Sequence, residues 1–586
     1  MILRGPPAPP ARRPSLPAAF ADARGHPSGV TFVDLREREA FHRWEELADR
    51  AARAAAALAA FGIRPGDRVA IVLRTGPAFL DAFFGAWRAG AVPVPLYPPV
   101  RLGRMEEWVA ATARMIAVSG ARVVVSSGAT RRLAGGAVAA ARPALGLVDA
   151  GDLLVGSRLA LEPAPDDLGL VQFSSGSTLE PKPVALSHRA LAAQIDALVA
   201  ATSPGPADVL VSWLPLYHDM GLLGGLLAAM SYPGPLVLIP PEHFLARPAL
   251  WLRAIARHRG TLSAAPSFAY AYAADRVRDE DLASLSLASW RLALDGAEAV
   301  SAEAMRRFAA RFGPFGLDPA ALVPVYGLSE AALAVTFALR GGRLEGRRVD
   351  PTRLARDGVV APGEREVVSV GAPLPGVAVA VRGPRGEDLP EGRLGTIHVR
   401  GPSLMEGYLG NPEATARALS GGWLDTGDLG FVLDGQLHVH GRAKDVVVVR
   451  GANHAPEEFE AALAGLPGLR PGCAVAVGTS SAGDGGEELV LLAERPHGRG
   501  EPDAALAARV RRAVLERTGI EPGAVRILAP GTLPRTSSGK PRRGEALRRL
   551  EAGTLAPPRR VTALGLAIDL ARGALASARA RRGGSS

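Results

Sequence analysis

The sequence predicts an α/β protein with a large N-terminal domain of two mixed or parallel sheets and their helices, a small β-rich subdomain, and a smaller α+β C-terminal domain. Three observations lead to this prediction. Apolar runs alternate with amphipathic stretches through the first half of the 586 residues, a pattern typical of parallel sheets with both faces covered. From Val367 the pattern changes to short strands between turns. Beyond Gly441 a second, shorter set of helices and strands follows.

The elements of the first half can be placed in order. Residues 1–30 are rich in Pro and Ala with little periodicity, so we expect them to be disordered. An Ala-rich amphipathic helix is predicted at 44–61, and Gly62 ends it. Then follow the strand 68–73, the helix 78–90, the strand 91–96, the helix 106–119 and the strand 122–126.

Several strands of the predicted sheets run into polar loops. The loops are Ser174-Ser175-Gly176-Ser177-Thr178 after strand 169–173, His218-Asp219-Met220-Gly221 after strand 209–214, Asp295-Gly296-Ala297-Glu298 after strand 292–294, and Tyr326-Gly327-Leu328-Ser329-Glu330 after strand 323–325. In open α/β sheets, ligands bind at the carboxyl ends of strands. We therefore expect these loops to form a binding site.

The second half divides into several parts. Segment 340–366 is Arg- and Gly-rich with no clear core face, and the β-rich part after it includes strands 377–381 and 395–400. The C-terminal unit should contain helix 456–466, strands 473–478 and 489–494, helix 502–518, and a closing loop that ends at Lys540. The predicted domains span 31–441 and 442–555, followed by an Arg/Ala-rich tail at 556–586. Helical spacing of apolar residues in the tail favours a weak surface helix over a docking or membrane helix.

Composition limits the classes of function. The formal net charge is +10, but no basic block is interleaved with aromatic residues, so we expect no nucleic-acid partner. The single cysteine, Cys473, excludes an internal disulfide framework and is typical of a reducing compartment. The N-terminus lacks the apolar stretch of a signal peptide, and no apolar run approaches about 18 residues. We expect a cytoplasmic protein without a transmembrane segment.

The loop from Ser174 to Thr178 has two interpretations. Its small side chains and single Gly allow backbone N–H groups to approach an anion closely, as in loops that bind phosphates. A solvated turn is the alternative, and for this loop alone it is the commoner case. No Walker A pattern is present.

The use of lysine favours the phosphate interpretation. Of 68 Lys and Arg residues, only three are lysines: Lys182, Lys444 and Lys540. Each lies in a segment with a nearby Gly that has the character of a ligand loop. Since arginine serves nearly everywhere else, these positions indicate a need for a compact ammonium on a flexible stem.

Five segments together resemble the adenylate-forming superfamily of acyl-CoA synthetases, luciferases and nonribosomal adenylation domains. They are 173–182, 326–330, 423–428, 441–445 and 534–540, and they follow the order of the family from about Trp44 to Leu550.

Within that superfamily the sequence is most similar to fatty acyl-AMP ligases. The likeness rests on 96–99, 212–215 with 218–221, 265–270 and Asn453-His454. Segment 340–366 lies where those ligases carry an extra insertion. Pro183 departs from the usual Gly after the lysine, and Ala452 and Ala455 replace bulkier residues. None of the three departures removes a catalytic group.

The resemblance implies a site for ATP and Mg²⁺. Ser174, Ser175, Gly176, Ser177, Thr178 and Lys182 would bind the pyrophosphate, and Glu330 with Thr178 would bind the metal. Tyr326 and Gly327 would contact adenine near Gly296, Ala297 and Glu298, and Asp428 would bind the ribose with Arg442 beside it. Lys540 would bridge the carboxylate and the α-phosphate, and Lys444 would lie at the hinge of a mobile C-terminal domain.

The implied reaction is activation of a fatty acid to acyl-AMP, followed by transfer to a holo acyl carrier protein in trans, of a polyketide or nonribosomal synthase. The alternative is a fatty acyl-CoA synthetase. A non-catalytic paralogue would be expected to lack Lys540, Glu330 or Asp428, and all are present. His218, Asp219, Met220 and Gly221 would shape the acyl pocket. His218 and Asp219 could instead form a general-base pair, but no nucleophile elbow accompanies them.

Overall fold

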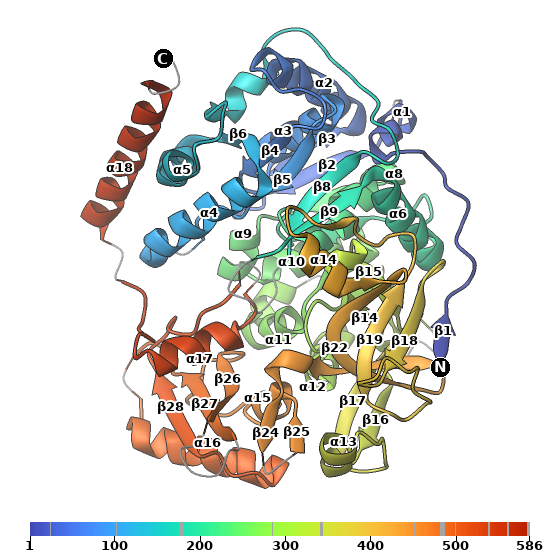
Figure 1. Cartoon of the computed structure of the whole chain (residues 1–586), viewed down its shortest axis with the longest axis vertical. Helices are drawn as coiled ribbons and strands as arrows, with labels where there is room; N and C mark the ends of the chain where they lie inside the picture. The colour runs from blue at the N-terminus through green and yellow to red at the C-terminus, as the bar shows by residue number, and fades with distance from the viewer. Residues whose placement is uncertain are drawn as a thin grey trace.

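The computed structural model describes the chain except for residues 24, 101, 175–180, 284, 340–343, 450–451, 481–486, 499, 537–538, 560–561 and 583–586. A large N-terminal body carries a smaller C-terminal unit at one end (Figure 1). No helix of the described residues is long and apolar enough to cross a bilayer.

A four-stranded parallel sheet forms one part of the large body. Its order is β5-β4-β6-β7, with β4 (Arg68–Val72), β5 (Val92–Pro95), β6 (Ala121–Ser126) and β7 (Leu147–Asp149). The neighbouring helices are α2 (Trp44–Ala60), α3 (Pro77–Arg88), α4 (Met105–Ser119) and α5 (Gly128–Ala141). A Cβ on Gly85 of α3 would come within 2.5 Å of the Ala54 Cβ, so small residues allow α2 and α3 to pack closely. Every element predicted between 44 and 126 is confirmed, with ends within two residues.

The second sheet is large and mixed. Its parallel part consists of β2 (Gly29–Val33), β11 (Leu236–Leu238), β10 (Leu210–Ser212), β12 (Leu262–Ala265), β13 (Leu292–Asp295) and β14 (Leu322–Gly327), with β3 (Glu39–Arg43) antiparallel at one edge. Beyond β14 it continues antiparallel through β15 (Ala334–Phe337), β17 (Arg365–Pro373), β23 (Gln436–Arg442), β22 (Trp423–Leu433), β19 (Gly395–Arg400) and β18 (Ala378–Arg382). The predicted β-rich strands therefore form, and β15 and β17 join them to the central sheet.

A small antiparallel sheet positions the Ser-rich loop. It contains β8 (Leu168–Phe173), β9 (Pro183–Ser187) and β20 (Gly407–Tyr408), and α6 (His188–Thr202) follows β9. The Ser174 N–H donates to the Lys182 carbonyl at 3.0 Å, which closes the base of the loop between the two strands.

The C-terminal unit has its own sheet and core. β26 (Ala474–Ser480), β27 (Glu487–Glu494) and β28 (Ala524–Leu528) form the sheet, with α15 (Pro456–Ala461), α16 (Asp503–Thr518) and α17 (Arg543–Glu551) as its helices. A hairpin of β24 (Val447–Val449) and β25 (Ala452–His454) precedes α15. The tail forms α18 (Ala563–Arg582), which lies beside α5 of the large body (Figure 1).

The predicted disorder of residues 1–30 is wrong for most of that segment. β1 (Ile2–Arg4) pairs with β18, and a short turn leads into α1 (Ala19–Asp22). Leu3, Leu16 and Phe20 are buried in the main core, and the Phe20 ring contacts Phe84 of α3 edge-on at 4.7 Å. Three widely spaced apolar anchors are enough to fix the segment, although they leave no periodic pattern.

Segment 340–366 also differs from its prediction, because its described part has a core face. β16 (Gly346–Val349) pairs with β17, and α13 (Pro351–Asp357) begins at Asp350, whose carboxylate accepts from two backbone N–H groups. Val349 and Leu354 pack against Val367 and Phe431. Two of the four side chains of this cluster come from outside the segment, so the segment alone does not reveal it.

Candidate active site

One cleft of about 2950 Å³ lies between the large body and the C-terminal unit. The loops after β10, β12, β13 and β14 line one side, because parallel neighbours present their carboxyl ends at the same edge of the sheet. The loop of Lys540 lines the other side. Most predicted site residues line this cleft, namely Ser174, Lys182, His218, Asp219, Met220, Ala297, Glu298, Tyr326, Gly327, Glu330, Asp428, Arg442, Lys444 and Lys540.

Lys540 is carried by a tight loop of the C-terminal unit. The Thr536 N–H donates to the Lys540 carbonyl at 2.8 Å, and the Lys540 N–H donates to Thr536 Oγ1 at 3.0 Å. Gly539 adopts a φ of 93°, which a side chain would disfavour, and so permits the reversal. Upstream, the buried Leu533 donates its N–H to Glu494 Oε1 at 2.8 Å and fixes the loop to the sheet.

The side chain of Lys540 lies among carboxylates of the large body. Burial lowers the pKa of Lys540, and the charges of Asp219 and Glu298 oppose that shift. These two acids follow β10 and β13, so they reach Lys540 across the cleft. Burial raises the pKa of Glu298, whose Oε1 accepts from the Phe268 N–H at 2.7 Å. The ammonium of Lys540, on its flexible side chain, thus lies where an anionic ligand could bind.

His218, Asp219 and Ser329 form a connected group beside Lys540. His218 Nδ1 lies 2.6 Å from Asp219 Oδ1, and Ser329 Oγ donates to Asp219 Oδ2 at 2.5 Å. Burial alone would raise the pKa of Asp219, but His218 and the hydroxyl bond hold it below its ordinary value. Because the hydroxyl and the imidazole each bond the carboxylate, the geometry is not that of a hydroxyl nucleophile activated by histidine. It is consistent with the interpretation of His218 as a wall of the pocket.

Asp428 is bound by two partners at the end of the mixed sheet. Asp428 on β22 is paired in register with Arg442 on β23, and the Arg442 Nε lies 2.8 Å from Asp428 Oδ1. Tyr326 at the end of β14 donates its hydroxyl to Asp428 Oδ2 at 2.7 Å. Burial raises the pKa of Asp428, and Arg442 opposes this shift. A carboxylate held this way can accept from the two hydroxyls of a ribose, and the assignment of Tyr326 to adenine stays a prediction.

Glu330 and Lys182 meet at one tyrosine. Tyr408 on β20 donates its hydroxyl to Glu330 Oε1 at 2.9 Å, and the Lys182 ammonium lies over the Tyr408 ring, 4.5 Å from its centroid. Burial and Glu330 both raise the pKa of Tyr408, so its phenol stays a donor. Tyr408 therefore contacts the Lys182 ammonium with its ring and the Glu330 carboxylate with its hydroxyl.

Lys444 lies where β23 leaves the large body. It is part of the short turn Ala443–Asp445 directly after Arg442. Burial lowers the pKa of Lys444, Asp445 opposes this, and Arg442 and Lys182 lower it further. All three lysines of the chain therefore face the same cleft, as their scarcity suggested. The hinge role of Lys444 stays a prediction.

Some predicted site residues are placed elsewhere. Ser175, Gly176, Ser177 and Thr178, and with them the threonine ligand for Mg²⁺, lie outside the described residues. Gly296 and Gly221 do not line the cleft. Gly296 lies against β14, where a Cβ would meet Val325 Cγ2 at 2.5 Å, and a Cβ on Gly221 would meet the Pro215 carbonyl oxygen at 2.4 Å. Both glycines permit close packing beneath the site.

The site also contains a residue that the sequence did not indicate. Tyr408 lies 78 residues from Glu330, and no local pattern connects them. In the predicted loop after β13, Asp295 is fully buried and does not line the cleft; burial raises its pKa well above its ordinary value, and Ser267 donates to its Oδ2 at 2.6 Å. Ala297 of the same loop lines the cleft and has a φ of 69°, a conformation that non-glycine residues adopt rarely. Strain of this kind concentrates at ligand sites, but only coordinates reveal it.

The cleft continues into an apolar branch. Leu198 and Val199 of α6 line one wall, and Gly224 and Gly225 of the π-helical turn Leu222–Leu227 line the other, with Ala228 beyond them. The two glycines widen this wall: a Cβ on Gly224 would meet Leu333 Cδ2 at 3.1 Å. His218 and Lys540 line the same cleft as these apolar side chains.

The described residues are compatible with a shared metal site. They contain no group of three or more His, Cys, Asp or Glu residues arranged to hold an ion. Mg²⁺ in nucleotide sites is usually held by one or two carboxylates together with the phosphates. Glu330, whose carboxylate accepts a hydrogen bond from the Tyr408 hydroxyl, is the residue that would fulfil this need.

The structure thus brings a lysine of the C-terminal unit to carboxylates of the large body, which is the arrangement expected of an adenylate-forming enzyme. The comparisons agree. The model of the AMP-binding enzyme family matches residues 20–409. A putative acyl-CoA synthetase of Caulobacter vibrioides is 35% identical over 560 residues, covering 92% of this chain and 96% of that protein.

A further relative and a solved structure indicate the branch of the family to which the chain belongs. The long-chain-fatty-acid–AMP ligase FadD26 of Mycobacterium marinum is 34% identical over 575 residues, covering 92% of this chain and 96% of that protein. A solved structure from a study of fatty acyl-adenylate ligases of E. coli and L. pneumophila has a TM-score of 0.87 at 33% identity, covering 93% of this chain and 99% of that one. The chain belongs to the AMP-binding enzyme family, in its fatty acyl-AMP ligase branch, and is an ATP-dependent, AMP-forming ligase.

Proposed function

We propose that the chain activates a fatty acid with ATP to acyl-AMP and pyrophosphate, and then passes the acyl group to the phosphopantetheine thiol of an acyl carrier protein in trans. The observation that carries this proposal is the position of Lys540, beside the carboxylates beyond β10 and β13 and in the same cleft as the apolar branch. A carboxylate head group placed at the end of that branch would lie beside the ammonium.

The first step brings a carboxylate against a polyanion, so it needs fixed positive charge. A carboxylate oxygen forms a bond to the α-phosphorus, and the bond to the bridging oxygen breaks to release pyrophosphate. Lys540 would neutralise charge on both reacting groups, and Lys182 would face the leaving pyrophosphate. Asp428 would hold the ribose. Mg²⁺, bound by Glu330 and the phosphates, would supply further charge neutralisation.

In the second step the sulfur of the thiol attacks the acyl carbon, its proton passes to solvent, and AMP leaves. Two contacts support a carrier protein as the acceptor. Arg365 at the start of β17 pairs with Glu458 of α15 at 3.0 Å, and α13 contacts β25. Segment 340–366 thus braces the C-terminal unit, which would restrict the rotation that opens a CoA site. The phosphopantetheine thiol of a carrier protein could still reach the site, because the carrier docks on the outside and supplies binding energy remote from the reacting thiol.

The alternative acceptor is CoA, the substrate class in the name of the Caulobacter relative. One experiment distinguishes the two: the purified protein with ATP, Mg²⁺ and a panel of fatty acids, supplied with either CoA or a phosphopantetheinylated carrier protein. We expect pyrophosphate release with fatty acids and thioester formation only on the carrier. Rapid conversion to acyl-CoA would overturn the acceptor, and no pyrophosphate release with any fatty acid would overturn the activation step.

A further inference from the structure

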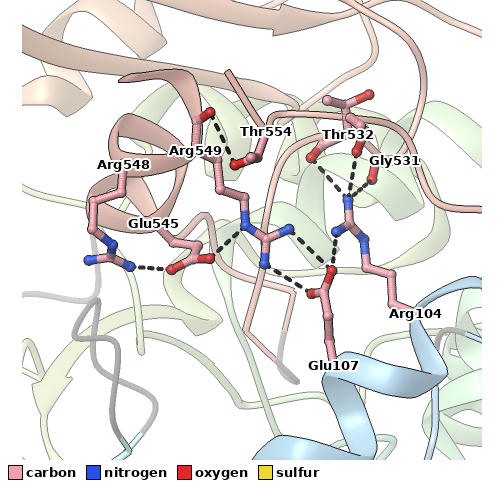
Figure 2. Close-up of polar contacts among 9 residues, drawn as sticks. Arg104, Glu107, Gly531, Thr532, Glu545, Arg548, Arg549 and Thr554 are labelled. Atoms are coloured by element: carbon pink, nitrogen blue, oxygen red, sulfur yellow. Dashed lines mark hydrogen bonds and ion pairs between the residues drawn. The ribbon is translucent and has the colours of Figure 1, made fainter. Parts of the chain in front are cut away.

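The face of α4 towards the C-terminal unit carries two charged side chains that cross the boundary between the domains. Arg104, just before α4, donates from Nη2 to the carbonyls of Gly531 at 3.3 Å, Thr532 at 3.2 Å and Ala556 at 3.1 Å. Glu107, in the first turn of α4, accepts from both amino nitrogens of Arg549 on α17, at 3.2 and 3.0 Å. Figure 2 shows both side chains pointing into the boundary from the start of α4.

These contacts form one alternating chain of charges. Arg104 Nη1 lies 2.7 Å from Glu107 Oε1, and Arg549 Nε lies 2.6 Å from Glu545 Oε1 (Figure 2). We call Arg104, Glu107, Arg549 and Glu545 the α4 clasp. Burial alone would raise the pKa of Glu107, but its bonds to the two arginines hold it below the ordinary value. The Arg104 and Arg549 side chains are 12% and 20% exposed, whereas that of Glu107 is 51% exposed, so water screens the pairs from the carboxylate side.

The clasp holds the chain on both sides of Lys540. Arg104 grips Gly531 and Thr532, which lead into the Lys540 loop, and Glu107 grips α17, which begins at Arg543, just after Lys540. The segments on both sides of the Lys540 loop are therefore bound to the large body. The acids that Lys540 faces, Asp219 and Glu298, belong to that same body.

We propose that Arg104 and Glu107 are positioning residues for adenylation, which hold Lys540 against the acids of the large body without touching substrate. This inference rests on the proposed role of Lys540. Catalytic groups lose rate steeply when they shift by as little as about 1 Å, so loosening the clasp should slow the first half-reaction. The second half-reaction, in which the proposed function gives Lys540 no role, should not depend on the clasp.

The test measures both half-reactions separately in Glu107→Gln, Arg549→Met and the double variant. Adenylation is followed as pyrophosphate release, and thiol transfer starts from supplied acyl-adenylate. We expect each single variant to lower adenylation kcat by about tenfold, with KM for ATP nearly unchanged and transfer undiminished. Since both residues act through one contact, the double variant should be no slower than the worse single variant.

Glu106→Gln is the matched control. Glu106 is the neighbouring residue on α4, and it also makes an ion pair with the C-terminal part, at 3.1 Å to Arg559, but its side chain is 81% exposed. It should behave as the unmodified protein. Glu107→Asp, which keeps the charge, should recover part of the lost rate.

The outcomes separate this inference from the proposed function. If Lys540→Ala adenylates normally, the proposed role of Lys540 fails. If Lys540→Ala is impaired while Glu107→Gln and Arg549→Met adenylate like the unmodified protein, the clasp proposal fails. Equal loss in both half-reactions of the clasp variants would also overturn it, because the clasp would then only stabilise the fold.

Discussion

Lys540 lies among acids of the large body. Its replacement should therefore affect one half-reaction far more than the other. We expect Lys540→Ala to lower adenylation by about a hundredfold or more, the size typical of losing a charge contact made in the transition state. Transfer from supplied acyl-adenylate to a thiol should change much less. Equal losses in the two assays would argue against the assignment.

The lowered pKa of Lys540 predicts a pH limit. Burial favours the neutral amine, so the ammonium loses its proton below the ordinary value of 10.5. Adenylation needs the charged form, and its rate should therefore fall as the pH rises through this lowered pKa. In Lys540→Arg the guanidinium stays charged, so the alkaline fall should disappear from whatever rate remains. A pH–rate profile of pyrophosphate release for both proteins checks this.

Asp428 and Glu330 should fail in different ways. Asp428→Ala removes the carboxylate that Tyr326 and Arg442 hold, so the KM for ATP should rise by about tenfold or more. Glu330→Gln should lower the rate and shift its Mg²⁺ dependence to higher concentration. Glu413→Gln, on the exposed side of a nearby helix, is the control for both. Unchanged ATP and Mg²⁺ titrations in the two site variants would show that the site is misplaced.

At this scale the sequence predicted individual residues better than their partners. The loop of Tyr326 was predicted locally, because Gly-containing loops after apolar strands are recognisable from the sequence. Asp428 and Arg442 were predicted from the resemblance of their segments to the adenylate-forming superfamily. Tyr408, which fixes Glu330 and carries Lys182 on its ring, was missed because it comes from a distant strand. The left-handed conformation of Ala297 has no sequence signal either, since alanine ordinarily indicates a helix.

At the scale of elements, segment 340–366 bears directly on the acceptor. Deleting it would expose Phe431, which packs against Leu354, and would test stability as much as specificity. Arg365→Met is the sharper change, because it removes only the contact to Glu458, where the side chains are 18% and 6% exposed. We expect CoA thioester formation to rise while the adenylation rate stays within about twofold, since the brace would no longer limit rotation.

Arg347→Met is the matched control for this prediction. Arg347 lies on β16 of the same segment but pairs with Asp434 inside the large body. It should leave the choice between CoA and carrier protein unchanged. If Arg365→Met also leaves that choice unchanged, the brace does not determine the acceptor.

Elements with their own periodicity were predicted well, and elements that depend on remote partners were not. The helices and strands between 44 and 126 follow from their apolar patterns alone. β1 was missed because its strand partner β18 lies more than 370 residues away, and prolines follow β1 closely in the sequence. The core face of segment 340–366 was missed for the same reason, as Phe431 completes it.

At the scale of the whole molecule, the tail does more than its sequence indicated. The spacing of Ile568 and Leu575 favoured a weak surface helix, and these side chains are indeed 42% and 61% exposed. The contact with α5 involves Leu570, which packs against the core cluster to which α5 contributes, and Gly573, where a Cβ would come within 1.9 Å of the Arg132 carbonyl. A glycine in a helix is normally a destabilising residue, so its use as the contact point could not be predicted from periodicity.

This close approach gives a specific test. Gly573→Leu should displace α18 from α5, whereas Ala574→Leu, at an exposed neighbouring position, should not. Displacement should make the tail more sensitive to limited proteolysis and should speed thiol transfer, because the C-terminal unit would lose one of its attachments. Identical proteolysis patterns and transfer rates in the two variants would contradict this.

The position of α18 connects the C-terminal unit to the large body at both of its ends. The chain enters the unit after β23, and after the unit α18 packs beside α5 of the large body. Residues 552–562 could reach about 36–40 Å if fully extended. The bonds of Ala556 to Arg104 and of Arg559 to Gly103 shorten the slack to the few residues before them. A large rotation of the C-terminal unit therefore requires these contacts to break and residues 552–562 to extend. The length of this linker sets the upper limit of the rotation while α18 stays bound to α5.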